Sequence, residues 1–477
     1  MSTTNGIAGL LLITLVGTVP LAMAASDPFA TDALVAESPA ATLAGPVPTQ
    51  PCDFAAVPTS ALSLSDVVER SLCNNPQTHE AWANARAQAA QLGVSKAANL
   101  PSLSASGAAS HNATNGRDTV ASNSYNQQSA GLSLSYLLYN FGGRSAAIDN
   151  AAQVLIAANA AQDAAIQSVF LAAVQDYYQI FSAQAVVQAD LEAEKAALES
   201  LKAATVRYEV GTGTPADKLQ ARTAYSQAVL NRIRAEGDAK NAQGVLADVM
   251  GLDADMAVRI APPAVQTPDE HFTRDVSRLI DEARKNRPDL AAAEAQIKAA
   301  QANVTSARAT GRPSLSLSAD INYNDTSVSD PFRSSALGVT LSVPLFTGYN
   351  TTYRVRAAQE QVAVRTAQRD TIRQQIALDV WKAYQGLLTE TQSLKSSADL
   401  VNSAAESERV AMGRYKAGAG NILDVLTAQS ALASARQQNV QALYGWYIAK
   451  AALAQAMGQL DFAAISAPAA GQAPPEQ

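Results

Sequence analysis

Two long stretches of the 477-residue chain carry apolar residues with the period of an α-helix. Residues 144–210 contain neither proline nor glycine and residues 350–417 contain no proline, so each stretch can form one helix about 100 Å long. In the first stretch, the positions spaced alternately by four and three residues are apolar, except for two. These positions are Ile166, Phe170, Ala173, Tyr177, Ile180, Gln184, Val187, Leu191, Glu194, Leu198 and Leu201. This heptad spacing predicts coiled-coil packing along the helix.

Four shorter stretches also have helical character. They are residues 64–100, 215–250, 276–310 and 422–457. In each half of the chain, the two shorter stretches placed end to end are about as long as the long helix. Because the connection at 211–214 is short, it places successive helices side by side and antiparallel. The pattern therefore predicts a rod in which continuous helices lie beside broken ones.

Four other segments alternate apolar and polar residues with the period of a β-strand. They are residues 101–111, 129–141, 313–323 and 336–347. Their length and alternation match transmembrane β-strands of about 9–11 residues, with an apolar face toward lipid and a polar face toward a lumen. A soluble sheet packed on a core is the alternative, but aromatic residues near the strand ends favour the membrane. Those aromatic residues are Tyr139, Phe141, Tyr323 and Phe346.

Four strands cannot close a barrel, and open sheet edges are not tolerated in lipid. A membrane location therefore requires several copies of the chain. Two copies supply eight strands and three supply twelve.

The chain is an internal duplication. Residues 100–104, Leu-Pro-Ser-Leu-Ser, recur as Arg-Pro-Ser-Leu-Ser at 312–316, and Pro76 recurs as Pro288, an offset of 212 (288 − 76). Residues 207–211, Arg-Tyr-Glu-Val-Gly, recur as Arg-Tyr-Lys-Ala-Gly at 414–418, an offset of 207 (414 − 207). The five-residue difference (212 − 207) falls in the strand region, where loops absorb insertions at small cost. Each repeat has the order helix, strand, strand, long helix, short helix.

The repeats set the predicted domain limits. The first repeat covers residues 62–251 and the second covers 276–460, with a linker at 252–275 between them. Residues 1–24 contain an apolar run followed by small residues, which is typical of a cleaved signal peptide, although the start lacks the usual lysine or arginine. The Pro- and Ala-rich arm at 25–61 and the tail at 461–477 have no usable periodicity and are expected to be extended or disordered.

Charge and cysteine content restrict the possible functions. Charged residues make up 16% of the chain and the net charge is −7, so there is no basic surface for nucleic acid. Export would place Cys52 and Cys73 in an oxidising compartment, where a disulfide between them would join the arm to the first helix. Two unpaired thiols are the alternative.

Taken together, the motifs resemble the TolC-like family of outer membrane factors over residues 62–460. The resemblance rests on the duplicated order of elements and on short motifs. These motifs are Asn75-Pro76 and Arg287-Pro288 before helices, the Leu-Pro-Ser-Leu strand entry, Tyr139-Asn140-Phe141-Gly142-Gly143 and Leu345-Phe346-Thr347-Gly348 at strand exits, and the two Arg-Tyr-x-x-Gly turns followed by Asp217 and Asp424.

The resemblance implies a mainly α-helical protein with a small transmembrane β part. Its homotrimer would form a twelve-strand barrel in the outer membrane, continued by a long α-helical barrel in the periplasm. Its partners would be a periplasmic adaptor (membrane fusion) protein and an inner-membrane transporter, either ABC-type or proton-driven. The implied function is the exit duct of a tripartite export system that carries proteins by type I secretion or small toxic compounds.

The resemblance also assigns residues to the two turns. An acidic constriction or gate would contain Asp424, Asp217 and Tyr415, whereas the arginine of the family's closing contacts is replaced by Gly420 and a second aspartate by Thr427. The adaptor would dock at the turns, whose matching residues are Arg207, Tyr208, Gly211, Arg414, Tyr415 and Gly418. Simple capping is the alternative for these glycines and aspartates, because Gly211 and Gly418 suit left-handed helix ends and the aspartates suit first turns.

No catalytic motif is present in the sequence. There is no Gly-x-Ser-x-Gly, no phosphate-binding loop ending in Gly-Lys-Ser/Thr, and no His-Glu-x-x-His, and the three histidines are far apart in the chain. No cofactor or metal is expected. A periplasmic coiled-coil scaffold or adhesin is the remaining alternative, although it would not need four alternating strands of membrane length.

Overall fold

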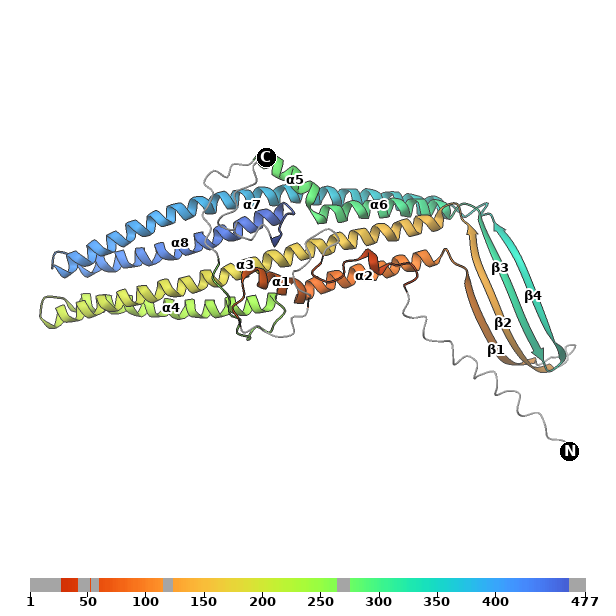
Figure 1. The fold of residues 1–477 in the computed structure, drawn as a ribbon, viewed down its shortest axis with the longest axis horizontal. Coiled ribbons are helices and arrows are strands. Elements are labelled where there is room, and N and C mark those ends of the chain that lie inside the picture. The colour runs from red at the N-terminus through yellow and green to blue at the C-terminus, as the bar shows by residue number, and fades with distance from the viewer. Residues whose placement is uncertain (1–26, 42–51, 53–59, 115–122, 264–274, 463–477) are drawn as a thin grey trace, which may run out of the picture.

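The computed structural model describes residues 27–41, 52, 60–114, 123–263 and 275–462. The first repeat contains α1 (Leu64–Asn74), α2 (Pro76–Ala97), β1 (Ser102–Thr114), β2 (Asn123–Tyr139), α3 (Gly143–Glu209) and α4 (Pro215–Val249). The second contains α5 (Val276–Asn286), α6 (Pro288–Ala309), β3 (Ser314–Thr326), β4 (Ser329–Ser342), α7 (Asn350–Lys416) and α8 (Ile422–Ala456). The mainly helical, duplicated fold with a small sheet is confirmed (Figure 1).

Corresponding helices of the two repeats have identical lengths. The pairs α1/α5, α2/α6, α3/α7 and α4/α8 contain 11, 22, 67 and 35 residues respectively. The predictions of single helices at 64–100 and 276–310 are wrong, because each is broken at the residue before a proline. Asn75 and Arg287 have extended backbones, with ψ of 131° and 122°. A following proline disfavours the helical conformation at these residues and then starts the next helix.

The helices form a long rod, as Figure 1 shows. Along α3, α2 covers the half near the sheet and α4 covers the other half, and α6 and α8 follow α7 in the same way. The two repeats join because α3 also packs against α6 and α8. At this junction the rings of Tyr178 and Tyr447 stack with centroids 4.8 Å apart. The expected rod of continuous and broken helices is therefore present.

The predicted heptad of α3 is buried over only part of its length. Ile166, Phe170 and Ile180 are buried, but Leu191 is 43% exposed and Gln184 is exposed. Within the single chain the predicted heptad is therefore buried from Ile166 to Ile180 and more open beyond. The helices packed against α3 change midway from α2 and α6 to α4 and α8. In addition, a straight helix drifts by about 20° per heptad relative to a strict 3.5-residue repeat.

The four strands form one antiparallel sheet with the order β1-β2-β3-β4. Three strands extend beyond the predicted ranges or start earlier: β1 reaches Thr114, β2 starts at Asn123 and β3 reaches Thr326. The fourth occupies 329–342 instead of the predicted 336–347. Because Pro344 lacks an N–H group and cannot donate to a strand ladder, the strand ends before it.

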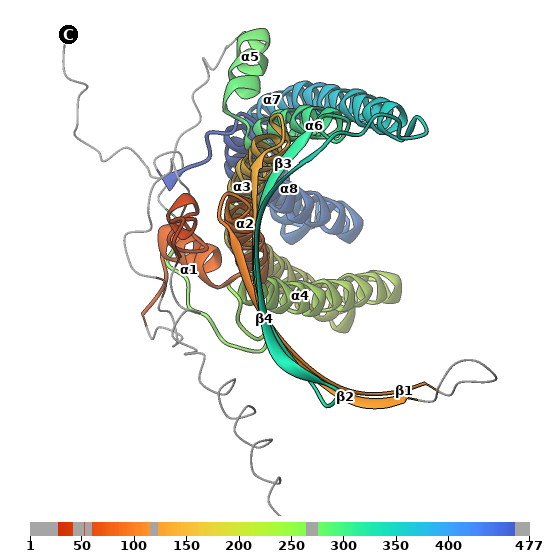
Figure 2. The ribbon, with the colours of Figure 1, turned by 90° about the vertical axis from the view of Figure 1, so that its right-hand side faces the viewer.

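The sheet and the helical layer are both curved. Figure 2 shows that the sheet is curved. Helix α1 lies on the convex side of this curve, and α4 and α8 lie on the concave side. The helix period places Ile166, Phe170 and Tyr177 of α3 in the core that α1 covers. A curved layer of this kind can form one part of the wall of a barrel.

Part of the N-terminal arm is ordered, contrary to the expectation of an extended or disordered segment. Trp82 Nε1 donates to Ala36 O at 2.9 Å, and Gln162 Nε2 donates to Ala41 O at 3.0 Å. Val35 is buried in a cluster of small residues from α2 and α3. A disulfide joins Cys52 to Cys73 of α1. The predicted signal peptide at 1–24 and the predicted tail beyond residue 462 lie outside the described residues.

Candidate functional site

The rod ends in two helical hairpins whose turns lie beside one another, and we call these turns the tips (Figure 1). In the first tip, α3 ends and Gly211 takes a left-handed conformation with φ of 79°. Thr214 then caps α4: its Oγ1 accepts from the Asp217 N–H at 3.2 Å, and Asp217 Oδ2 accepts from the Thr214 N–H at 3.0 Å. The Asp217 carboxylate is therefore part of a capping box.

The second tip repeats this geometry with one difference. Gly418 also has φ of 79°, and Asn421 Oδ1 accepts from the Asp424 N–H at 2.8 Å. The Asp424 side chain is exposed, and no group among the described residues donates a hydrogen bond to its carboxylate. Of the two predicted constriction aspartates, Asp217 serves as a cap and Asp424 presents a free charge.

Tyr415 is the most buried of the predicted tip residues, at 4% exposure. The Arg207 guanidinium lies over its ring, with Cζ 4.7 Å from the centroid, and Arg207 Nη1 donates to Tyr415 O at 2.7 Å. Burial raises the pKa of the Tyr415 hydroxyl; nearby Arg207 opposes this shift and Asp217 adds to it. The structure thus brings Tyr415, Arg207 and Asp217 together between the two hairpins.

The other predicted tip residues are more open. Tyr208 is 42% exposed, with Lys218 Nζ 5.4 Å from its ring centroid, and Arg414 is exposed. A side chain at Gly420 would crowd the turn, because a Cβ there would lie 3.2 Å from Arg414 Cβ. Thr427 is exposed on α8.

The opposite end of the molecule carries a row of apolar residues that crosses the whole sheet. Paired strand residues lie on the same face of a sheet. The register aligns Leu103, Leu134, Ala319 and Leu337 in one row across all four strands. Leu103 is 70% exposed and Leu337 is 78% exposed in the single chain. An exposed apolar face of this extent needs an apolar environment or a partner.

The other face of the sheet is polar. The neighbouring row contains Ser104, Ser133, Asp320 and Ala336, and the two serine hydroxyls lie 2.7 Å apart. Both outer strands, β1 and β4, have one edge without a strand partner in the described chain. The sheet therefore has the two faces of a transmembrane barrel wall and two edges for neighbouring strands.

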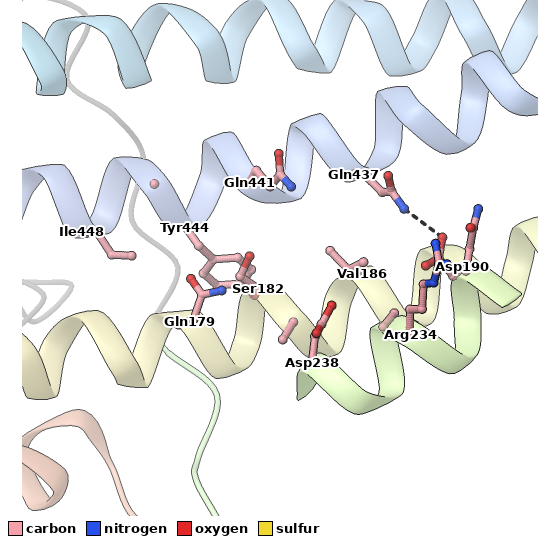
Figure 3. A pocket seen from close by; sticks show the side chains of 14 residues that line it. Gln179, Ser182, Val186, Asp190, Arg234, Asp238, Gln437, Gln441, Tyr444 and Ile448 are labelled. Atoms are coloured by element: carbon pink, nitrogen blue, oxygen red, sulfur yellow. Dashed lines mark hydrogen bonds between the residues drawn. The ribbon is translucent and has the colours of Figure 1, made fainter. Parts of the chain in front are cut away.

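A polar pocket of about 590 Å³ lies between α3, α4 and α8, part-way along the hairpins (Figure 3). Asp190 is buried, and Gln437 Nε2 donates to its Oδ1 at 2.9 Å. Burial raises the pKa of Asp190, and the hydrogen bond from Gln437 opposes that shift. Gln179 and Val186 also line the pocket, and the helix period places them away from the face of α3 that α1 covers. The pocket therefore opens toward the concave side.

Two features of this site were not predicted from the sequence. Arg207 is expected only as a docking residue, yet it contacts Tyr415 of the other hairpin. Asp190 is not singled out, because an isolated aspartate in a helical stretch is normally a surface residue. The only available signal was that Arg207 recurs as Arg414 in the duplication.

Comparison with known proteins agrees with this arrangement. A family model described as "Outer membrane efflux protein" matches residues 67–252 and 279–459. Protein CyaE of Bordetella pertussis is 30% identical over 418 residues, covering 86% of each chain. Outer membrane protein TolC of Vibrio cholerae is 24% identical over 410 residues, covering 84% of this chain and 91% of that protein.

A solved structure shares the fold. The CmeC outer membrane channel of Campylobacter jejuni superimposes with a TM-score of 0.75 at 20% identity, covering 83% of this chain and 85% of that one. Channels of this kind are trimers of the outer membrane that extend into the periplasm and work with adaptor proteins and inner-membrane transporters; they are not a class of enzymes. With the family model matching both repeats and the two-faced sheet continuing into a helical rod, the chain belongs to the outer membrane efflux protein family, the TolC-like outer membrane factors.

Proposed function

We propose that this chain is the exit duct of a tripartite export system that carries a secreted protein, by type I secretion, or small toxic compounds. The observation that carries the proposal is the open four-stranded sheet, with one apolar face and two free edges. Closing those edges with two further copies gives a barrel of twelve strands, in which the apolar row faces lipid. A soluble scaffold or adhesin would have to expose this face to water.

The periplasmic end of the proposed duct is narrowed by the tips. Asp424 supports a gate because its carboxylate is exposed and takes no part in capping. Three copies around an axis would form an acidic ring that favours cations. Asp217 and Tyr415 would belong to the contacts that hold the ring closed. Because Gly420 and Thr427 replace an arginine and an aspartate of the family pattern, we expect less charge at this ring than in relatives with the full pattern.

The same tips are the proposed docking sites for a periplasmic adaptor. The paired turns at Gly211 and Gly418 expose Tyr208 and Arg414 at the end of the rod farthest from the sheet. An ABC-type or a proton-driven transporter would supply the cargo through this adaptor. Loss of the gene should abolish secretion of one protein if the duct serves type I secretion, and should raise sensitivity to toxic compounds if it serves efflux.

The first test is single-channel conductance of the detergent-extracted protein in a planar bilayer, with ion selectivity measured under a salt gradient. Wild-type protein should give discrete, cation-selective steps. Asp424→Ala should lower the cation preference because it removes three carboxylates from the constriction. Asp255→Ala removes an exposed carboxylate far from the tips and serves as the matched control.

Two results would count against the proposal. Protein that remains soluble without detergent and forms no channel would favour the scaffold. If Asp424→Ala still gives conductance steps with the wild-type ion selectivity, the protein is a channel but Asp424 does not line its constriction.

A further inference from the structure

The two tips carry the same set of residues. Ala204, Arg207, Tyr208 and Ala221 in the first hairpin recur as Ala411, Arg414, Tyr415 and Ala428 in the second, all at an offset of 207 (411 − 204). Each hairpin therefore offers an arginine and two alanines, together with a tyrosine. A contact between one hairpin and the next can in principle be made twice.

One of the two contacts exists within the chain. Arg207 of the first hairpin lies over the Tyr415 ring of the second, with Cζ 4.7 Å from the centroid and a 2.7 Å hydrogen bond to Tyr415 O. Ala204 and Ala221 of the first hairpin are fully buried in the same cluster as Tyr415. These small residues leave room for the ring.

Arg414 and Tyr208 make no hydrogen bond or ring contact with the other hairpin among the described residues of the chain. The Arg414 side chain is exposed, and among the described residues its Nη2 donates only to Ala419 O of its own turn, at 3.5 Å. Tyr208 is 42% exposed, compared with 4% for Tyr415. Ala411 is half-buried, whereas its counterpart Ala204 is fully buried. Tyr208 and Ala411 are thus more exposed than their counterparts Tyr415 and Ala204, as expected for residues at an interface with another chain.

We propose that Arg414 of one copy lies over the Tyr208 ring of the next copy, so that the contact made by Arg207 and Tyr415 is repeated at each boundary between copies. The proposal rests on the trimeric duct proposed above, in which first and second hairpins alternate around a ring. The partner is a second copy of this chain because only that copy presents a first hairpin beside the second hairpin. Six arginine–tyrosine contacts would then surround the closed tip, three within chains and three between them.

The two kinds of contact differ in strength. Ile422 and Val425, which are buried with Tyr415, correspond to Pro215 and Lys218 beside Tyr208 (422 − 207 and 425 − 207). Lys218 Nζ already lies 5.4 Å from the Tyr208 ring centroid, so this ring would face two cations in a less apolar site. Cation–π contacts are weaker where water reaches them. The boundary between copies is therefore the weaker contact.

Cysteine cross-linking of the detergent-extracted oligomer tests the geometry. In the Arg414→Cys, Tyr208→Cys variant, a short bis-maleimide should join neighbouring chains and give bands of two and three chain masses on a denaturing gel. The Arg207→Cys, Tyr415→Cys variant is the matched control, in which the same reagent should join residues of one chain and leave the monomer mass. The native cysteines are paired in a disulfide and do not compete.

The outcomes are distinct from those for the channel itself. Monomer bands from the Arg414, Tyr208 pair, in a variant that still forms conducting trimers, would overturn the proposal and leave the duct standing. Chains joined through the Arg207, Tyr415 pair would also overturn it, because that contact would then lie between copies. Failure of the wild-type protein to form trimers or to conduct would instead defeat the proposed function.

A conductance measurement supplies a second readout. Arg414→Gln should raise the ratio of open to closed dwell times about tenfold, since three exposed cation–π contacts are lost together. Lys416→Gln, which removes another exposed cation two residues away, should leave the ratio unchanged. An unchanged ratio in Arg414→Gln would remove Arg414 from the closed tip.

Discussion

Asp217 and Asp424 are equivalent in sequence and different in use. Both are predicted as constriction residues, with a first-turn role as the alternative, and both follow a helix start by the same interval. Only Asp217 bonds back to the N–H of its cap, Thr214, whereas Asp424 is held through its own N–H by the Asn421 amide. The sequence allows the same first-turn role at both places, but which carboxylate stays free depends on the orientation of individual side chains.

Asp163 leads to a prediction about pH at the same scale. It lines a pocket beside Ile166 and Phe170 of α3, and burial raises its pKa to about 6. Because the unfolded chain loses this proton near pH 4, the folded state becomes less stable as pH rises from about 4 to about 6. Asp163→Asn should therefore raise the thermal midpoint at pH 8, by an amount equivalent to about 2 kcal/mol, and have little effect at pH 4.

Thermal unfolding of the two proteins followed by circular dichroism at both pH values tests this expectation. Asp149→Asn changes an exposed aspartate on the same helix and serves as the control. An Asp163→Asn protein that is no more stable than wild type at pH 8 would show that the buried carboxylate carries no cost.

At the scale of elements, the helices were better predicted than the strands. The 67-residue helices follow from the absence of helix breakers, because propensity acts over many residues. The breaks at Asn75 and Arg287 were missed, although the prolines that cause them are visible in the sequence. Strand ends depend on the partner strand, so β2 and β4 begin six or seven residues earlier than their own alternation suggests (129 − 123 and 336 − 329).

Neighbouring residues of β4 provide a matched test of the two faces of the sheet. Leu337 belongs to the apolar row and Ala336 to the polar row. Leu337→Lys should reduce the amount of assembled trimer in the outer membrane, since a lysine facing lipid near the bilayer midplane costs about 2–4 kcal/mol. Ala336→Lys should assemble normally and change the conductance. Trimer quantities on mild gels of isolated membranes measure both, and equal losses for the two variants would contradict the assignment of faces.

For the whole molecule, the duplication predicted the rod but not the position of the arm. Residues 27–41 are rich in small residues without periodicity, so their docking on α2 and α3 depends on a groove that exists only in the folded protein. The arm is held near the sheet end, where Lys96 Nζ donates to Phe29 O at 3.5 Å, and Cys52 ties it to Cys73 of α1 part-way along the rod. The described parts of the arm are therefore fastened to α2, α3 and α1.

Loss of the disulfide should weaken the attachment of the arm to α1. The bond closes a loop with a sequence separation of 21 residues, and a loop of that size contributes about 3 kcal/mol in the chain-entropy model. A variant with Cys52→Ser and Cys73→Ser should unfold at lower urea concentration and lose the arm faster to protease. Reducing agent should destabilise wild type to a similar degree and leave the variant unaffected. Identical urea midpoints for oxidised and reduced wild type would show that the disulfide does not contribute to the free energy of unfolding.

The identical lengths of corresponding helices have an evolutionary consequence. Inserting one residue into α3 would advance its later residues by about 1.5 Å and rotate them by about 100° relative to α6 and α8. Such a change is tolerable only if the second repeat acquires the same change. The helix lengths of each repeat are therefore constrained by those of the other. The five-residue difference between the repeats (212 − 207) instead lies in the sheet region, between the starts of β1 and β3 at Ser102 and Ser314 and the starts of α3 and α7 at Gly143 and Asn350. Mutational drift in length is thereby confined to the end of the molecule that faces the outside of the cell.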